Sequence, residues 1–133
     1  MTEITHASKN DMPIAISNEL YEVRTIEADD YIVSFFTLKA DWEPPALLFK
    51  GLPNDMCQSP HYGYVFKGQI VLKYVDHEET IKAGEAYYMK PGHIPIRGVK
   101  GTEFLEVSPK AENERTMAVV TKNMKALQAQ KPK

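Results

Sequence analysis

The sequence predicts an all-β protein, an antiparallel β-barrel or jelly roll, followed by one C-terminal amphipathic helix. Between residues 20 and 109 the chain alternates short β-branched and aromatic runs with turn residues, as sandwiches and barrels do. No helical stretches alternate with these runs, which disfavours a parallel sheet. After residue 109 the apolar residues recur at helical spacing instead.

Eight strands are expected within this β region. Glycine, proline, asparagine and charged residues interrupt the apolar runs, notably at 51–55, 75–79 and 90–93, and such residues favour turns. The expected strands span residues 20–26, 31–40, 46–50, 61–67, 69–75, 79–83, 85–90 and 103–108.

The last part of the chain should form a helix laid on the barrel. Met117, Val120, Met124 and Leu127 repeat at intervals of three and four residues. A partner-binding face would need the same stripe, but packing on the barrel explains it more simply. The expected organisation is a flexible tail over 1–12, a barrel over 13–110, the helix over 111–128 and a second flexible tail over 129–133.

Length and composition limit the classes of function. The chain has 133 residues, a size typical of one domain. A net charge of −2 gives no basic excess for nucleic acid. No signal-peptide pattern and no run of eighteen apolar residues is found, so a cytoplasmic location without membrane contact is expected. One cysteine, Cys57, is a buried hydrophobe, a free thiol or a metal ligand.

The segment from Asp55 to Pro95 resembles the cupin superfamily in the spacing of its residues. The first cupin motif runs histidine, any residue, histidine, three or four residues, glutamate, six residues, glycine. Counted back from Gly68, the glutamate position is His61, the second histidine position is Cys57 and the first is Asp55. The three positions therefore hold residues that are able to bind a metal.

The second cupin motif matches in its glycines but not in its ligand. It runs glycine, five residues, proline, one residue, glycine, two residues, histidine. Gly84 and Gly92 occupy the glycine positions, whereas Lys90 stands at the proline position and Pro95 at the histidine position. The resemblance implies a small single-domain cupin barrel with a degenerate metal motif.

The expected metal ligands are Cys57, His61 and His93. Cys57 and His61 are four residues apart, so on an extended chain both face one side, and the resemblance makes that side the barrel interior. His93 shares the face of Pro95 if the strand is regular there. A thiolate with two imidazoles suits zinc, and Asp55 is a candidate fourth donor or substrate-binding residue. The structural alternatives are a buried apolar Cys57, a turn-capping Asp55 and a turn-decorating His93.

Other residues are candidates for catalysis or substrate binding. Strand alternation turns one carboxylate of 103–108 toward the cavity, and Glu106 is favoured. Only one of the neighbours Tyr87 and Tyr88 faces inward, and Tyr88 is chosen here as a catalytic candidate. Arg97 shares the face of His93 and would bind a substrate carboxylate, which points to an organic acid.

Three functions from different classes are compatible with these residues. The leading hypothesis is a metal-dependent enzyme that acts on a small organic molecule, with zinc as Lewis acid. The alternative is a metal-free barrel that binds or senses a small molecule, which the missing second-motif histidine favours. The third is an assembly module, and the alternate-face aromatics Tyr62, Tyr64, Phe66 and Tyr88 predict a homodimer under all three hypotheses.

Overall fold

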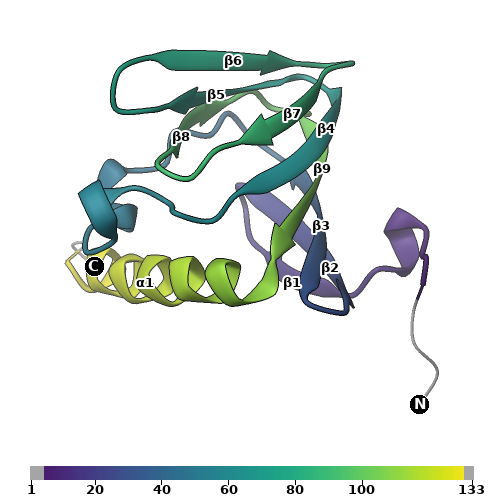
Figure 1. The fold of residues 1–133 in the computed structure, drawn as a ribbon, viewed down its shortest axis with the longest axis horizontal. Helices are drawn as coiled ribbons and strands as arrows, with labels where there is room; N and C mark the ends of the chain where they lie inside the picture. The colour runs from purple at the N-terminus through teal and green to yellow at the C-terminus, as the bar shows by residue number, and fades with distance from the viewer. Residues whose placement is uncertain (1–4, 131–133) are drawn as a thin grey trace.

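The computed structural model describes residues 5–130 and consists of two antiparallel sheets and one α-helix (Figure 1). The larger sheet has the strand order β1-β2-β3-β9-β4-β7, and the smaller has the order β6-β5-β8. The predicted fold class, an antiparallel β fold with one C-terminal helix, is confirmed. The larger sheet comprises β1 (Ile14–Ser17), β2 (Tyr21–Ala28), β3 (Tyr31–Leu38), β9 (Glu103–Pro109), β4 (His61–Lys67) and β7 (Ala86–Met89).

The smaller sheet lies across one end of the larger and closes over the core. It contains β6 (Glu78–Lys82), β5 (Gln69–Lys73) and β8 (Ile94–Gly98). Gly68 carries the chain directly from β4 into β5 with a φ of +75°, and a β-carbon there would collide with Thr102. A glycine is therefore required where the chain passes from one sheet to the other.

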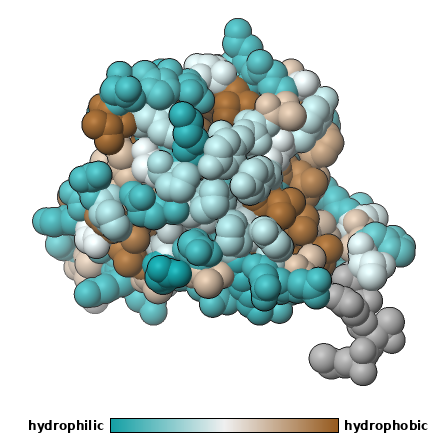
Figure 2. Space-filling view, in the orientation of Figure 1, coloured by the Kyte–Doolittle hydropathy of each residue, from teal (hydrophilic) through white to brown (hydrophobic). Residues whose placement is uncertain are grey.

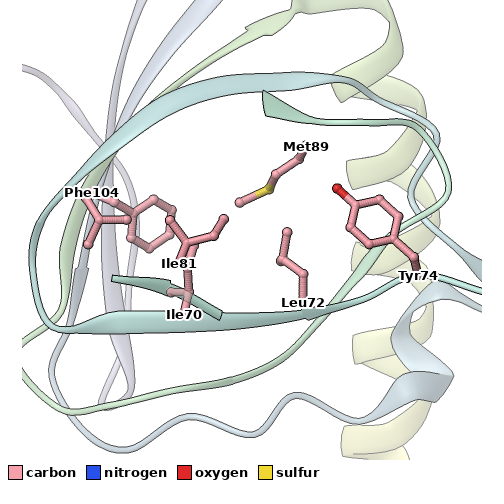
Figure 3. Packing of buried hydrophobic residues seen from close by; sticks show 7 residues of the cluster. Ile70, Leu72, Tyr74, Ile81, Met89 and Phe104 are labelled. Atoms are coloured by element: carbon pink, nitrogen blue, oxygen red, sulfur yellow. The ribbon is translucent and has the colours of Figure 1, made fainter. Parts of the chain in front are cut away.

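The core fills the space between the sheets with apolar side chains. Figure 3 shows these side chains gathered between β5, β6, β7 and β9, with Tyr74 directly after the end of β5. Leu72 is 1% exposed and Val65 is fully buried. The cluster comprises Val65, Ile70, Leu72, Tyr74, Ile81, Met89 and Phe104.

Three strand predictions need correction. Residues 46–50 do not form a strand: Ala46–Phe49 form the 3₁₀ turn η2, which follows a Pro–Pro pair and buries Leu48 and Phe49. The short edge strands β1 and β8 were not among the expected strands. β8 contains Pro95, which an edge strand tolerates.

The helix α1 (Lys110–Ala129) runs along the open side of the two sheets, next to η2 and η3 (Pro53–Asp55) (Figure 1). It is one residue longer at each end than the range predicted from the sequence. Val120 packs with Leu48 and Phe49, and the Asn123 side-chain amide donates to the carbonyls of Leu48 and Lys50 at 2.8 and 2.9 Å. The predicted apolar stripe therefore faces the rest of the domain.

The flexibility expected at the two ends of the chain stays a prediction. Residues 1–4 and 131–133 lie outside the described residues. Within the segment expected to be unpatterned, Lys9–Asp11 form the 3₁₀ turn η1, and Met12 is buried. Among the described residues, no helix has the length and apolar character needed to cross a bilayer.

Candidate metal centre and cavity

Cys57, His61 and His93 converge inside the domain. One potential ligand atom from each residue lies within 4.8 Å of the other two, and all three residues are buried. The Cys57 Sγ to His61 Nε2 distance is 3.6 Å. The structure thus brings together the three residues that the sequence predicted as metal ligands.

Backbone pairing holds two of these residues together although they lie in separate loops. Cys57 forms an isolated antiparallel bridge with His93, in which the Cys57 N–H donates to the His93 carbonyl at 2.8 Å. The Gly92 N–H donates back to the Cys57 carbonyl at 2.8 Å, from a residue with a φ of +92°. His61 comes from the first position of β4, opposite Met89.

The outer nitrogens of both imidazoles are occupied, which fixes the rings. His93 Nδ1 donates to the Lys90 carbonyl at 2.5 Å, so its Nε2 keeps a lone pair. His61 Nδ1 lies 2.6 Å from Ser108 Oγ and 3.5 Å from Glu106 Oε2, and either oxygen can accept the proton of the tautomer that carries it on Nδ1. The His61 Nε2 lone pair then faces Cys57, an arrangement of outer-shell hydrogen bonds typical of metal-binding histidines.

Burial favours the uncharged form of each member of this cluster. It raises the pKa of the Cys57 thiol, against a smaller lowering by the Thr116 hydroxyl, which lies 3.6 Å from the sulfur. It lowers the pKa of His61 to about 4 and also lowers that of His93. Neutral imidazoles are the forms that bind metal ions.

A carboxyl and a phenol lie beside the cluster. Glu106 is buried, and desolvation raises its pKa to about 7. The Tyr87 hydroxyl donates to Glu106 Oε1 at 2.9 Å. Burial raises the pKa of Tyr87 as well, so its hydroxyl keeps its proton. The two residues therefore form a buried hydrogen-bonded pair next to His61.

Strand register explains this pair. Gly63 stands opposite Tyr87 on one side and opposite Glu106 on the other, and Ser34 continues the same row on β3. A β-carbon at Gly63 would overlap the Leu105 carbonyl oxygen and the Tyr87 ring. Because Gly63 has no side chain, the ring of Tyr87 can pack against it and reach the Glu106 carboxyl.

The structure places three predicted site residues elsewhere. Tyr88 is 51% exposed and stacks on Tyr62, with ring centroids 5.0 Å apart, because its neighbour Tyr87 takes the inward position. Asp55 is exposed and accepts a hydrogen bond from the Gly51 N–H at 3.0 Å, which is the turn-capping alternative. The expected inward orientation of Tyr88 and Asp55 is not observed.

Arg97 is exposed as well, and a bulge accounts for its orientation. On β5, the adjacent residues Leu72 and Val71 pair with Pro95 and Arg97, so Ile96 is an extra residue on β8. The extra residue reverses the alternation of faces after Pro95. Pro95 therefore lines the interior and Arg97 faces outward.

Sequence reasoning missed Tyr87, Ser108 and Thr116. A signal for Tyr87 was present: Met89, two residues later, is apolar, and residues two apart on a strand share a face. Ser108 likewise shares the face of Glu106 two residues before it. Thr116 carried no signal, because it is one polar residue on a helix whose orientation comes only from packing.

The cluster opens into a cavity of about 950 Å³ between the sheets, η2 and α1. Most of its wall is apolar, and Thr116, Met117 and Val120 contribute the helix side. Ser34, Cys57, His61, His93 and Glu106 are among its polar residues.

Comparisons with known proteins identify the architecture. No protein-family model and no curated protein matches the chain. Among solved structures, the polyketide cyclase RemF from Streptomyces resistomycificus is similar at 22% identity, over 80% of each chain, with a TM-score of 0.55. An RmlC-like cupin from Shewanella frigidimarina is 10% identical over 80% of this chain and 92% of that one, with a TM-score of 0.55.

Oxalate decarboxylase from Bacillus subtilis matches at 16% identity, over 82% of this chain and 30% of its own length, with a TM-score of 0.55. At these identities the similarity bears on architecture rather than on activity. Together with the sheet order and the helix described above, these matches show that the chain has the cupin fold.

Proposed function

We propose that this protein is a metal-dependent enzyme in which Cys57, His61 and His93 hold a divalent ion and an organic substrate occupies the adjoining cavity. The observation that carries the proposal is the convergence of three buried donor atoms, within 4.8 Å of one another, on the wall of that cavity. The cupin neighbours that are named as enzymes, a polyketide cyclase and an oxalate decarboxylase, support an enzymatic role for this fold.

A thiolate with two imidazoles is a donor set that suits zinc, and the distance between the donor atoms of Cys57 and His61 supports this choice. Bond lengths of about 2.3 Å to sulfur and about 2.05 Å to nitrogen place a tetrahedral sulfur–nitrogen pair about 3.6 Å apart. The Cys57 Sγ to His61 Nε2 distance is 3.6 Å. Three protein ligands leave one tetrahedral position for substrate or water, as in catalytic zinc sites.

A divalent ion supplies Lewis-acid chemistry when bound, either by polarising a substrate oxygen or by lowering the pKa of a water to about 7. The protein supplies the remaining parts. Ser108 and Lys90 hold the imidazole rings by their Nδ1 atoms. Glu106, which lines the cavity beside His61, would accept or donate a proton at the substrate, and the Tyr87 hydroxyl holds its Oε1.

The metal content of the protein tests this proposal. We expect protein purified without a histidine tag to contain close to one zinc or similar ion per chain by elemental analysis. Cys57→Ala, His61→Ala and His93→Ala should each lower that content severalfold. His77→Ala is the matched control, because His77 is exposed in the β5–β6 turn and should leave the metal content unchanged.

A metal-free binding protein is the second candidate, and the large apolar cavity favours it because a cavity needs no ion to hold a ligand. Unmodified protein that stays free of metal after incubation with zinc would support it and refute the enzyme proposal. If metal is present, Glu106→Gln should keep the metal and lose turnover.

We also infer that a second copy of the chain covers the outer aromatic face, which consists of Tyr62, Tyr64, Phe66 and Tyr88 on β4 and β7. These four side chains are 38–51% exposed. Lys67 and Glu103, which pair at 3.0 Å, bring both signs of charge beside this face, as a self-complementary contact needs. Figure 2 shows apolar patches separated by hydrophilic residues on one side of the molecule.

The cytoplasmic location remains a prediction.

A further inference from the structure

The charged residues that line the cavity indicate the charge of its ligand. Among the described residues that line it there is no lysine and no arginine, whereas Glu19, Glu43 and Glu106 do line it. Arg97, the residue expected to bind a substrate carboxylate, is exposed on the outer side of β8. An anionic ligand would therefore find no lysine or arginine in the described lining with which to pair.

Burial of a charge without a partner is costly. An ionised carboxylate moved into an apolar site without a counter-ion loses several kcal/mol or more of hydration. The Cys57 thiolate would offset one of the two charges of a divalent ion bound at the cluster. An uncharged ligand avoids this cost.

The size and composition of the walls indicate the body of the ligand. The cavity volume of about 950 Å³ lies at the upper end of the range of roughly 300 to 1,000 Å³ for sites that hold drug-sized molecules. Its apolar surface combines aliphatic side chains with aromatic rings and methionines, which bind ring systems well. They include Phe36, Trp42, Leu72, Phe104, Met117 and Met124.

Polar groups are concentrated at one part of the wall. The rings of His61 and His93 are 5.1 Å apart, and Glu106 lies beside His61 at 3.5 Å. A ligand that fills the apolar part therefore meets buried hydrogen-bonding groups at this end, whereas the other acidic lining residues, Glu19 and Glu43, are exposed. This arrangement orients an elongated molecule by a single polar group.

We propose that the cavity binds an uncharged, apolar molecule of two or more rings that directs one oxygen, as a ketone or hydroxyl, toward the Cys57, His61 and His93 cluster. The inference rests on the proposed function only in naming the metal-binding cluster as the group that the ligand oxygen faces. The preference for a neutral ring system follows from the walls and holds with or without a metal.

Two probes of the same ring system separate charge from shape: 2-acetylnaphthalene, a neutral ketone, and 2-naphthoate, an anion. We would titrate both by calorimetry into protein treated with a chelator and into protein loaded with zinc. The ketone should bind in both forms, about tenfold more tightly than the anion or better. Trp42, the one tryptophan of the chain, lines the cavity, and its fluorescence should change on binding.

Two variants that each add one positive charge to α1 test whether the preference for the neutral ligand arises in the cavity. Met117→Lys places a cation on the wall and should reduce the preference for the ketone severalfold by strengthening the binding of 2-naphthoate. Ala118→Lys adds the same charge one residue along α1, at an exposed position outside the lining, and should leave the preference unchanged.

The outcomes distinguish this inference from the metal proposal. Equal or tighter binding of 2-naphthoate to the chelator-treated protein, or no binding of either probe up to their solubility, would overturn the inference whatever the metal content. Tight binding of the anion to the zinc-loaded form alone would overturn it while supporting the metal site. A neutral preference in protein that never binds metal would support the inference and refute the proposed enzyme.

Discussion

The hydrogen bond between Tyr87 and Glu106 should contribute measurably to stability, and Tyr87→Phe removes it without changing the shape of the ring. The bond measures 2.9 Å and its acceptor carboxyl is buried. Loss of one partner leaves a buried polar group unsatisfied at a cost of about 1–3 kcal/mol. We take about 1.5 kcal/mol as the expected loss, because the carboxyl retains a second contact, with His61 at 3.5 Å.

The expected shift in melting temperature follows from the chain length. An unfolding entropy of about 2.1 cal/mol/K per residue gives roughly 280 cal/mol/K for a domain of this size. A loss of about 1.5 kcal/mol then lowers Tm by about 5 °C. Differential scanning calorimetry or urea unfolding measures this directly, with Tyr88→Phe as the matched control because Tyr88 is exposed.

A double-mutant cycle decides whether the effect belongs to this contact. Glu106→Leu removes the acceptor, so Tyr87→Phe should cost far less in that background, and the coupling between the two changes should be about 1 kcal/mol or more. A coupling near zero, or a Tyr87→Phe protein as stable as the Tyr88→Phe control, would show that the buried pair is not held as described.

Three further perturbations test other parts of the structure. Gly63→Ala should lower the free energy of unfolding by more than about 2 kcal/mol, because the new methyl meets the Leu105 carbonyl, and unchanged urea unfolding would refute the strand register. Lysine partners lower the pKa of Glu103, so its stabilisation is present above its ordinary pKa and is lost as the pH falls through the lowered value. Glu103→Gln should therefore cost up to about 1 kcal/mol at pH 7 and progressively less as the pH falls through the lowered pKa, and a cost that does not fall with pH would contradict the ion pairs. Tyr64→Glu should convert a dimer to a monomer in light scattering whereas Val75→Glu, in an exposed turn, should not; a monomeric unmodified protein would remove the dimer altogether.

Strand alternation and turn residues predicted much of the fold. Gly68 and Gly92 have positive φ angles, which glycine adopts readily. These two glycines therefore marked positions where the chain turns. The convergence of Cys57 and His61 followed from their four-residue spacing. The 46–50 segment was misassigned because a short apolar run does not by itself distinguish a strand from a helical turn.

The misplaced site residues have different causes. The choice between Tyr87 and Tyr88 depends on which face of β7 is buried, and the apolar Met89, which shares the face of Tyr87, was the local signal for it. Arg97 turned outward because of one bulge residue, and a single inserted residue reverses every later side chain on a strand. Contacts of α1, including Thr116 with Cys57, depend on how the helix packs.

The proline at the histidine position of the second cupin motif does not by itself imply loss of the site. Pro95 lines the cavity, as a ligand at that position would, but it offers no donor atom. His93, two residues earlier, reaches the same cluster because the backbone of Cys57 pairs with it in an isolated bridge. Cys57, from the first motif, and His93, which stands in for the missing histidine of the second motif, are thus held together by the pairing of their two loops. Both imidazoles are hydrogen-bonded at Nδ1, and the Nε2 of His61 meets the sulfur of the buried Cys57 at 3.6 Å, which is the arrangement that metal-binding histidines show. The geometry therefore favours a rearranged metal centre over an abandoned one.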